Sequence, residues 1–201
     1  MPQPDAEPRR DATPAKTTFA AAGLADTVLV KVGGSLLDLP DLGTRLRELP
    51  GILGHPCRLL IGGGEAADLI RRLHRTHDLD SAASHRLAIA AMDLNAAVVR
   101  EMLGNSSAES VLSAVSEVAA CEASGLAVPA SWDVTSDSIA AFAARRRRCP
   151  LLLAKSLPPP QSVAVAAARG IVDPYFVTAN AGRPIGWINL RMTDPISVRL
   201  N

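Results

Sequence analysis

Short runs of valine, leucine and isoleucine that end in glycine or lysine divide the chain. The first run, residues 27–32, is apolar on both faces apart from Lys31, which is typical of an interior strand in a parallel sheet. Runs at 57–61, 150–154 and 185–191 predict three more strands. Apolar residues at helical spacing lie between these runs. The helices that we expect cover residues 40–49, 65–77, 81–103, 112–119 and 139–147.

This alternation of strands and helices favours βαβ units. We therefore expect an α/β fold, a three-layer αβα sandwich with a mostly parallel central sheet. Pro50 should end the first helix at Leu49, and valines leave a strand possible at 112–119. Residues 126–130 should form an edge strand or loop, and residues 170–176 should begin a short helix or turn.

Composition bounds the class of protein. The 201 residues suffice for one α/β domain, and 3% aromatic residues leave Ala, Leu and Val to build its core. Residues 1–16 are rich in proline and charge, so we expect a disordered leader at 1–24 and a single cytoplasmic domain at 25–201. A net charge of +1 gives no argument for a nucleic-acid or membrane partner. Three scattered cysteines are expected to be buried, in a reducing compartment.

Lys31 and the glycines that follow it form the first candidate site. A lysine in a buried strand is costly unless its ammonium group meets an anion at the carboxyl end of the strand. Gly33 and Gly34 allow the backbone to approach a ligand closely. The segment alone fits equally well a lysine that reaches solvent at the sheet rim, beside an ordinary turn.

The second candidate site is a run of three glycines, residues 62–64, between a predicted strand and a predicted helix. Free amides and the positive end of the helix dipole make such a turn suitable for an anion. The pattern is neither a Walker A loop nor a GxGxxG motif. Two such turns in succession, the first with a lysine, predict two phosphate-binding strand ends side by side.

The helix at 81–103 is apolar almost all round between residues 87 and 99, so we expect it to be buried in the core or in a subunit interface of a homodimer or larger homo-oligomer. Asp93 and Asn95, in its middle, should bind either a neighbouring helix, which is favoured, or a ligand. His85 either faces a ligand pocket or is a core histidine with a hydrogen-bond partner. The four histidines have no metal-ligand spacing, and no metal ligand is expected.

The third candidate site is the expected start of a helix at residues 135–138. Asp137 falls in the first helical turn, where a carboxylate suits the dipole, so capping and a role in a site fit it equally. The arginines at 145–148 are expected to form a solvated helix end. Lys155 directly follows the predicted strand at 150–154. It is the second lysine beside a buried strand, since Lys31 lies within the first strand.

Three segments in this order, VKVGGS at 30–35, IGGG at 61–64 and TSDSIA at 135–140, resemble the amino acid kinase family. This family includes acetylglutamate, aspartate, uridylate and carbamate kinases. The resemblance covers residues 27–176 and is strongest to small members of the 5-(aminomethyl)-3-furanmethanol phosphate kinase type. It implies that the chain has this fold with a shortened C-terminal half. It also implies transfer of the γ-phosphoryl group of ATP, shielded by Mg²⁺, to a carboxylate, carbamate or phosphate oxygen.

The resemblance further implies roles for single residues. Lys31 would bridge the migrating phosphoryl group, and Asp137 would orient the lysines. The residues whose amides would hold the nucleotide phosphates are Gly33, Gly34 and Ser35. The residues that would hold the acceptor are Gly62, Gly63, Gly64 and His85.

One departure concerns the family's second catalytic lysine, expected near residues 170–176, where Asp173 and Pro174 stand instead. Either Lys155 replaces this lysine or the nucleotide site is reduced.

Two hypotheses about function follow. The first is an ATP-dependent phosphotransferase for a small phosphate- or carboxylate-bearing metabolite, with one-carbon cofactor biosynthesis of the methanofuran or methanopterin type preferred. The second is a non-catalytic binding or scaffold subunit.

Overall fold

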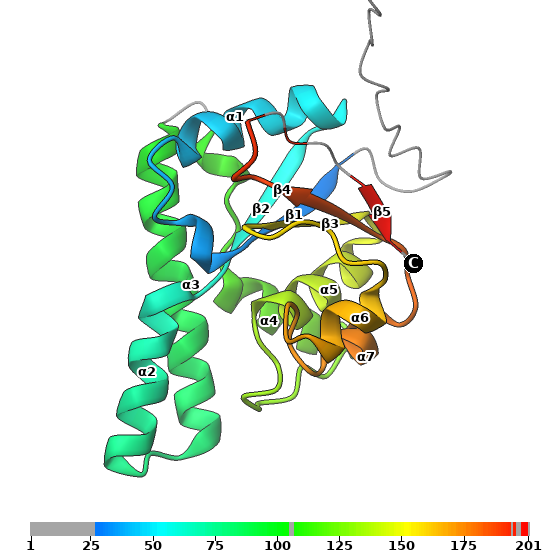
Figure 1. Ribbon diagram of the computed structural model, residues 1–201. Coiled ribbons are helices and arrows are strands. Elements are labelled where there is room, and N and C mark those ends of the chain that lie inside the picture. Colours follow the sequence, from blue (N-terminus) through cyan, green and yellow to red (C-terminus); the bar gives the residue numbers. More distant parts are fainter. Residues whose placement is uncertain (1–26, 105–106, 194, 196–197, 201) are drawn as a thin grey trace, which may run out of the picture.

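The computed structural model describes residues 27–104, 107–193, 195 and 198–200; the leader predicted at 1–24 lies outside them. A five-stranded sheet forms the centre of the molecule (Figure 1). Its strands are β1 (Val28–Val32), β2 (Cys57–Ile61), β3 (Leu151–Lys155), β4 (Ile185–Asn189) and β5 (Val198–Leu200). The strand order is β2-β1-β3-β4-β5, and only β5 pairs antiparallel to its neighbour.

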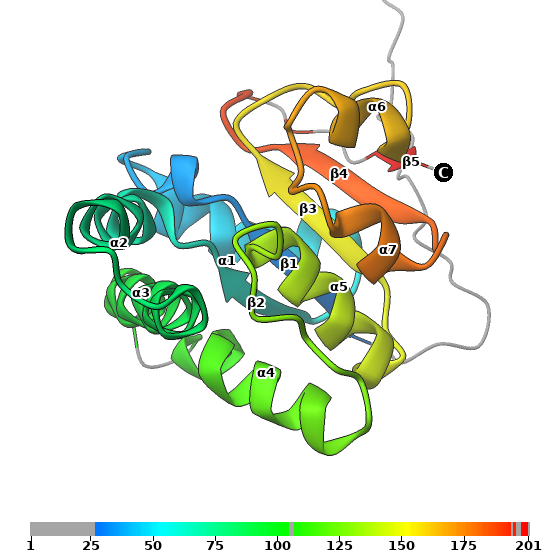
Figure 2. The same cartoon turned by 90° about the horizontal axis from the view of Figure 1, so that it is seen from below.

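Helices cover both faces of the sheet. They are η1 (Gly34–Leu36), α1 (Leu42–Leu53), α2 (Gly64–His77), α3 (Ser81–Leu103), η2 (Ala108–Ser110), α4 (Ala114–Ala123), α5 (Ser136–Arg147), α6 (Val163–Ala168) and α7 (Phe176–Asn180). One core lies between the sheet and α1, and the other between the sheet and α5 with α6 and α7. Figure 2, the view from below, shows α5 in front of the sheet, where it packs on β1 and β3, and α4 packs against α5. The predicted α/β fold with a mostly parallel sheet is confirmed.

The interior strands follow directly from their sequence. Every residue of β1 and β3 is buried, because helices cover both faces. Val30 and Leu152 face the core under α1, whereas Leu29 and Leu153 face α5. Burial of each such side chain contributes roughly 1.5–3 kcal/mol. Lys31 alternates with Val30 and therefore points to the α5 side.

Helix α3 runs past the β2 edge and joins both cores. Ile89 and Met92 pack on the α5 side, and Val99 packs on the α1 side. Its other face is open: Leu94 is 61% exposed and Leu87 is 48% exposed. The expected all-round burial of residues 87–99 is therefore not reached within this chain. With α2, α3 forms a hairpin that extends beyond the sheet (Figure 1).

Several element boundaries differ from the predictions. Helix α1 continues through Pro50 to Leu53, where Gly54 ends it in the left-handed conformation, because buried leucines on both sides of the proline keep the helix on the sheet. Helix α4 runs from residue 114 to 123 after a Ser113 cap. Residues 126–130 form a loop. Residues 170–175 form a turn that leads into α7 at Phe176, whereas α6 and β5 were not predicted.

The expectation of a solvated arginine run was wrong. Glu117 of α4 is buried, and Arg146 and Arg147 of α5 both donate hydrogen bonds to its carboxylate. Burial alone would raise the pKa of Glu117, but these arginines outweigh it and hold the pKa below its ordinary value. The arginine run therefore connects α4 to α5.

The three cysteines are free and buried, and burial raises the pKa of Cys57 to about 12.

Candidate functional site

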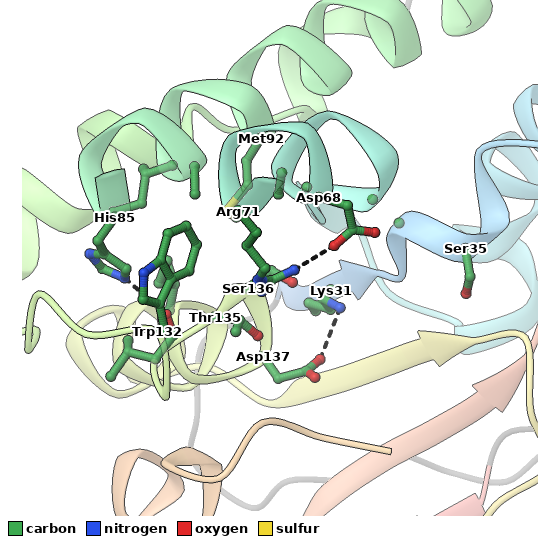
Figure 3. A pocket seen from close by; sticks show the side chains of 18 residues that line it. Lys31, Ser35, Asp68, Arg71, His85, Met92, Trp132, Thr135, Ser136 and Asp137 are labelled. Atoms are coloured by element: carbon green, nitrogen blue, oxygen red, sulfur yellow. Dashed lines mark hydrogen bonds and ion pairs between the residues drawn. The ribbon is translucent and has the colours of Figure 1, made fainter. Parts of the chain in front are cut away.

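A buried carboxylate bridges two lysines at the carboxyl ends of β1 and β3. Lys31 pairs in register with Leu153, so Lys155 lies two residues farther along the same face of the neighbouring strand. Asp137, in the first turn of α5, lies 2.9 Å from Lys31 Nζ through Oδ1 and 2.8 Å from Lys155 Nζ through Oδ2 (Figure 3 shows the Lys31 pair). All three residues are at most 8% exposed. Lys31 therefore does not reach bulk solvent at the rim, the alternative that the sequence left open.

Electrostatics in this group follow from burial and proximity. Burial would raise the pKa of Asp137, but the two ammonium groups outweigh burial and hold the pKa below its ordinary value. Burial lowers the pKa of Lys155 from 10.5 to about 8; the charge of Lys31 adds to this fall, and Asp137 and Asp173 oppose it. With both lysines protonated, they and Asp137 together carry one net positive charge, and the carboxylate of Asp173, which acts on Lys155, offsets it.

The two glycine turns touch each other beside this group. A Cβ atom on Gly34 would lie 2.3 Å from the backbone nitrogen of Gly64, and Gly64 itself has a φ of +47°. Only glycine fits at this contact. Asn95 of α3 donates hydrogen bonds of 2.8 Å to the carbonyl oxygens of Gly62 and Gly63. Asn95 therefore binds a glycine turn and not the neighbouring helix that we expected. Asp93 does bind a neighbouring helix, since its carboxylate accepts hydrogen bonds at the start of α4.

A pocket of about 230 Å³ opens between the glycine turns, the α2–α3 hairpin and the start of α5 (Figure 3). Among the residues that line it are Lys31, Gly34, Ser35, Gly63, Gly64 and Asp137. Apolar side chains also contribute to the lining: Ile89, Met92, Trp132, Val134 and Ile139. This combination suits a small ligand with one anionic and one apolar part.

Arg71 and Trp132 also line the pocket, and no pattern in the sequence pointed to them. The guanidinium carbon of Arg71 lies 5.2 Å from the centre of the Trp132 ring, and Arg71 donates to Asp68 (Figure 3). In the sequence, an arginine in the middle of α2 looks like any solvated helix residue. His85 satisfies both of its predicted alternatives, since it lines the pocket and its Nε2 lies 2.9 Å from the carbonyl oxygen of Val134.

Three of the predicted site residues do not line the pocket. Gly33 and Gly62 extend the sheet instead, because their amides donate 2.8 Å hydrogen bonds to Ala154 and Val32. Lys155 lies behind Asp137, where its ammonium group also donates to the carbonyl oxygen of Ile171 at 2.8 Å. Ser35 does line the pocket, and its hydroxyl lies 2.9 Å from that of Ser156.

Two negative findings apply to residues 27–104, 107–193, 195 and 198–200. These residues contain no group of three or more His, Cys, Asp or Glu side chains that could hold a metal ion. In the same part of the chain, each helix is too short or too polar to cross a membrane.

Comparison with solved structures shows the amino acid kinase fold. Uridylate kinase from Archaeoglobus fulgidus superimposes with a TM-score of 0.55 and 16% identity, over 80% of this chain and 88% of that one. UMP kinase from Ureaplasma parvum gives a TM-score of 0.53 and 12% identity, over 88% and 96%. At these identities the likeness establishes the fold, which is the fold that the family resemblance implied.

Comparison with curated protein sequences gives one relative. The chain is 29% identical over 126 residues to [5-(aminomethyl)furan-3-yl]methyl phosphate kinase of Methanocaldococcus jannaschii. The match spans 57% of this chain and 58% of that relative. No protein-family model matches the chain. The sequence comparison therefore gives a relative that is named a kinase, and the structural comparison gives the fold.

Proposed function

We propose that the protein is an ATP-dependent phosphotransferase whose acceptor is a small phosphate- or carboxylate-bearing metabolite. The observation that carries this proposal is the Lys31–Asp137–Lys155 group beside two touching glycine turns. Phosphoryl transfer requires positioning and positive charge more than covalent chemistry, since charge spreads over the equatorial oxygens of the migrating group. A buried ammonium group held by a fixed carboxylate supplies that charge without reorganisation.

We assign the roles as follows. Lys31, which lines the pocket, neutralises the phosphoryl oxygens, and Asp137 orients both lysines. Lys155 acts as the second cation in place of the lysine that the resemblance expected near residues 170–176. Gly34 and Ser35, with Gly33 as their support, serve the nucleotide phosphates.

The acceptor side is formed by Gly63, Gly64 and His85, with Gly62 as their support. Arg71 and Trp132 add a cation and an aromatic face to the pocket lining. A phosphate ester on a small ring matches this lining, and the relative's name describes such a compound. We therefore propose a phosphorylated acceptor in one-carbon cofactor biosynthesis of the methanofuran type.

ATP supplies the γ-phosphoryl group when it is bound. The described residues fit its phosphates, through the amides of the first glycine turn, better than they fit Mg²⁺. Asp137 already contacts two ammonium groups, and no acidic cluster is found in the described part of the chain. Mg²⁺ would therefore be carried by the nucleotide phosphates, as is common for this ion.

Titration calorimetry with ATP and Mg²⁺, followed by a ³¹P NMR turnover assay with small phosphate esters, tests the proposal. Lys31→Ala should abolish turnover and leave the circular dichroism spectrum unchanged. Arg58→Ala, which removes an exposed cation from the neighbouring strand β2, should leave turnover unchanged. Absence of ATP binding, or full activity of Lys31→Ala, would refute the proposal.

The second candidate function is a non-catalytic binding subunit. It is favoured by Asp173, which stands where the resemblance expects a catalytic lysine and whose carboxylate binds the start of α5. Under this alternative, anionic metabolites bind the pocket but ATP does not, which the same calorimetric titration reveals.

We also propose that the chain forms a homo-oligomer through α3. Its exposed face carries an apolar stripe of Leu87, Leu94, Val98 and Met102, at helical spacing. An exposed apolar stripe of this kind is typical of an interface.

A further inference from the structure

Asp173 holds the beginning of α5 from outside the helix. It lies in the turn before α7 and is 7% exposed. Its Oδ2 accepts hydrogen bonds from Thr135 N at 3.0 Å, Thr135 Oγ1 at 2.8 Å and Ser138 N at 3.0 Å, and its Oδ1 accepts one from Ser138 Oγ. Thr135, the N-cap residue, makes no capping bond of its own. Asp173 therefore supplies the carboxylate cap that such a helix start needs.

The same turn contacts the site a second time. The carbonyl oxygen of Ile171 accepts a 2.8 Å hydrogen bond from Lys155 Nζ. Residues 171–173 thus hold Lys155 directly, and they hold Asp137 through Thr135 and Ser138, which flank it in the sequence. A shift of this turn would change both distances between Asp137 and the lysines.

We propose that Asp173 is a positioning residue of the phosphoryl-transfer site, which fixes the first turn of α5 so that Asp137 spans Lys31 and Lys155. Its catalytic meaning rests on the proposed function. Its charge has a second effect, because the Asp173 carboxylate is the second negative charge that acts on Lys155. The charged groups that face Lys155 are Lys31 from β1, Asp137 from α5 and Asp173 from the turn. The Trp187 ring on β4 is 5.9 Å away.

The chain has only three lysines, Lys16, Lys31 and Lys155, so its ¹³Cε-lysine NMR spectrum can be followed residue by residue through a pH titration. Asp173→Asn keeps an oxygen for the backbone amides but removes the charge. We expect Lys155 to titrate about one pH unit lower in this variant than in the wild type. Ser138→Ala, the matched control, removes one donor but keeps the charge, so Lys155 should titrate as in the wild type.

Kinetics provide the second measurement. Asp173→Asn should lower kcat about tenfold or more, leave the acceptor KM within twofold, and move the alkaline limb of the pH profile to lower pH. If Asp173→Asn does not fold, the Thr135→Val/Ser138→Ala double variant takes its place. It should lower kcat, because Asp137 then loses the contacts that fix its position between the two lysines.

Two outcomes overturn the inference. One is an unchanged Lys155 titration in Asp173→Asn. The other is a double variant whose kcat equals that of the wild type. If the wild-type chain turns over no ATP, the proposed function fails, and the lysine titration still decides whether Asp173 sets the charge of this cluster.

Discussion

Replacement of Lys155 by methionine gives the most quantitative test of the buried charge group. The folded state lowers the pKa of Lys155 from 10.5 to about 8, chiefly through burial. Between these two pH values the unfolded chain holds a proton that the folded chain has released. Stability therefore rises with pH in this window.

The expected size follows from the same two values. At about 1.36 kcal/mol for each pH unit, a fall from 10.5 to about 8 corresponds to a stability cost of about 3 kcal/mol below pH 8, which disappears by pH 10.5. Lys155→Met removes the titrating group and fills a similar volume. The free energy of unfolding of the wild type, relative to that of the variant, should rise by about 3 kcal/mol from pH 7 to pH 10.5.

Urea unfolding of both proteins at half-unit pH steps measures this difference. Lost contacts to Asp137 and Ile171 shift the whole variant curve and do not change its slope against that of the wild type. Cysteine and tyrosine titrations are common to both proteins and cancel. Parallel stability curves between pH 7 and pH 10.5 would refute the account of Lys155 as a desolvated, partly compensated ammonium group.

Three further predictions concern the pocket and the surface. Gly34→Ala places a Cβ atom 2.3 Å from a backbone nitrogen of the second glycine turn and should cost about 1–3 kcal/mol in urea unfolding, whereas Gly51→Ala, with open space around it in α1, should be neutral or stabilising by up to about 1 kcal/mol. Leu94→Glu should convert the oligomer to a monomer in analytical ultracentrifugation, with a stability change within about 0.5 kcal/mol; a wild-type monomer would remove the oligomer proposal. Arg71→Ala should weaken acceptor binding about tenfold or more in calorimetry, and Arg72→Ala, its exposed neighbour, should not.

The parts of the fold that were predictable are those where local pattern and tertiary environment agree. A strand buried on both faces has to be apolar throughout, so β1 and β3 were evident from their residues alone. Lys31 was informative for the same reason, as the one expensive residue in such a run. Asp137 remained undecided because its two interpretations are both true: it lies in the first helical turn and it binds the lysines.

The failures share a cause, since each depends on a partner that is remote in sequence. Glu117 converts an arginine run from a solvated end into a contact between two helices. Asp173 was noted only as the residue in place of an expected lysine, although its carboxylate caps a helix that begins much earlier in the chain. Trp132 reaches the pocket from a loop without any periodic pattern. Single-sequence reasoning has no access to such pairings.

The position of Lys155 also offers a way to separate the two candidate functions by pH. In the proposed kinase, Lys155 is the second cation, and its proton leaves near pH 8 in the ligand-free protein. Because kcat/KM reports ionisations of the free enzyme, kcat/KM for phosphoryl transfer should fall above about pH 8. Binding of an anionic ligand to a scaffold subunit depends on Lys31, which lines the pocket, more than on Lys155, which lies behind Asp137. Under the scaffold alternative, the affinity of the subunit for an anionic ligand should therefore change little between pH 7 and pH 9.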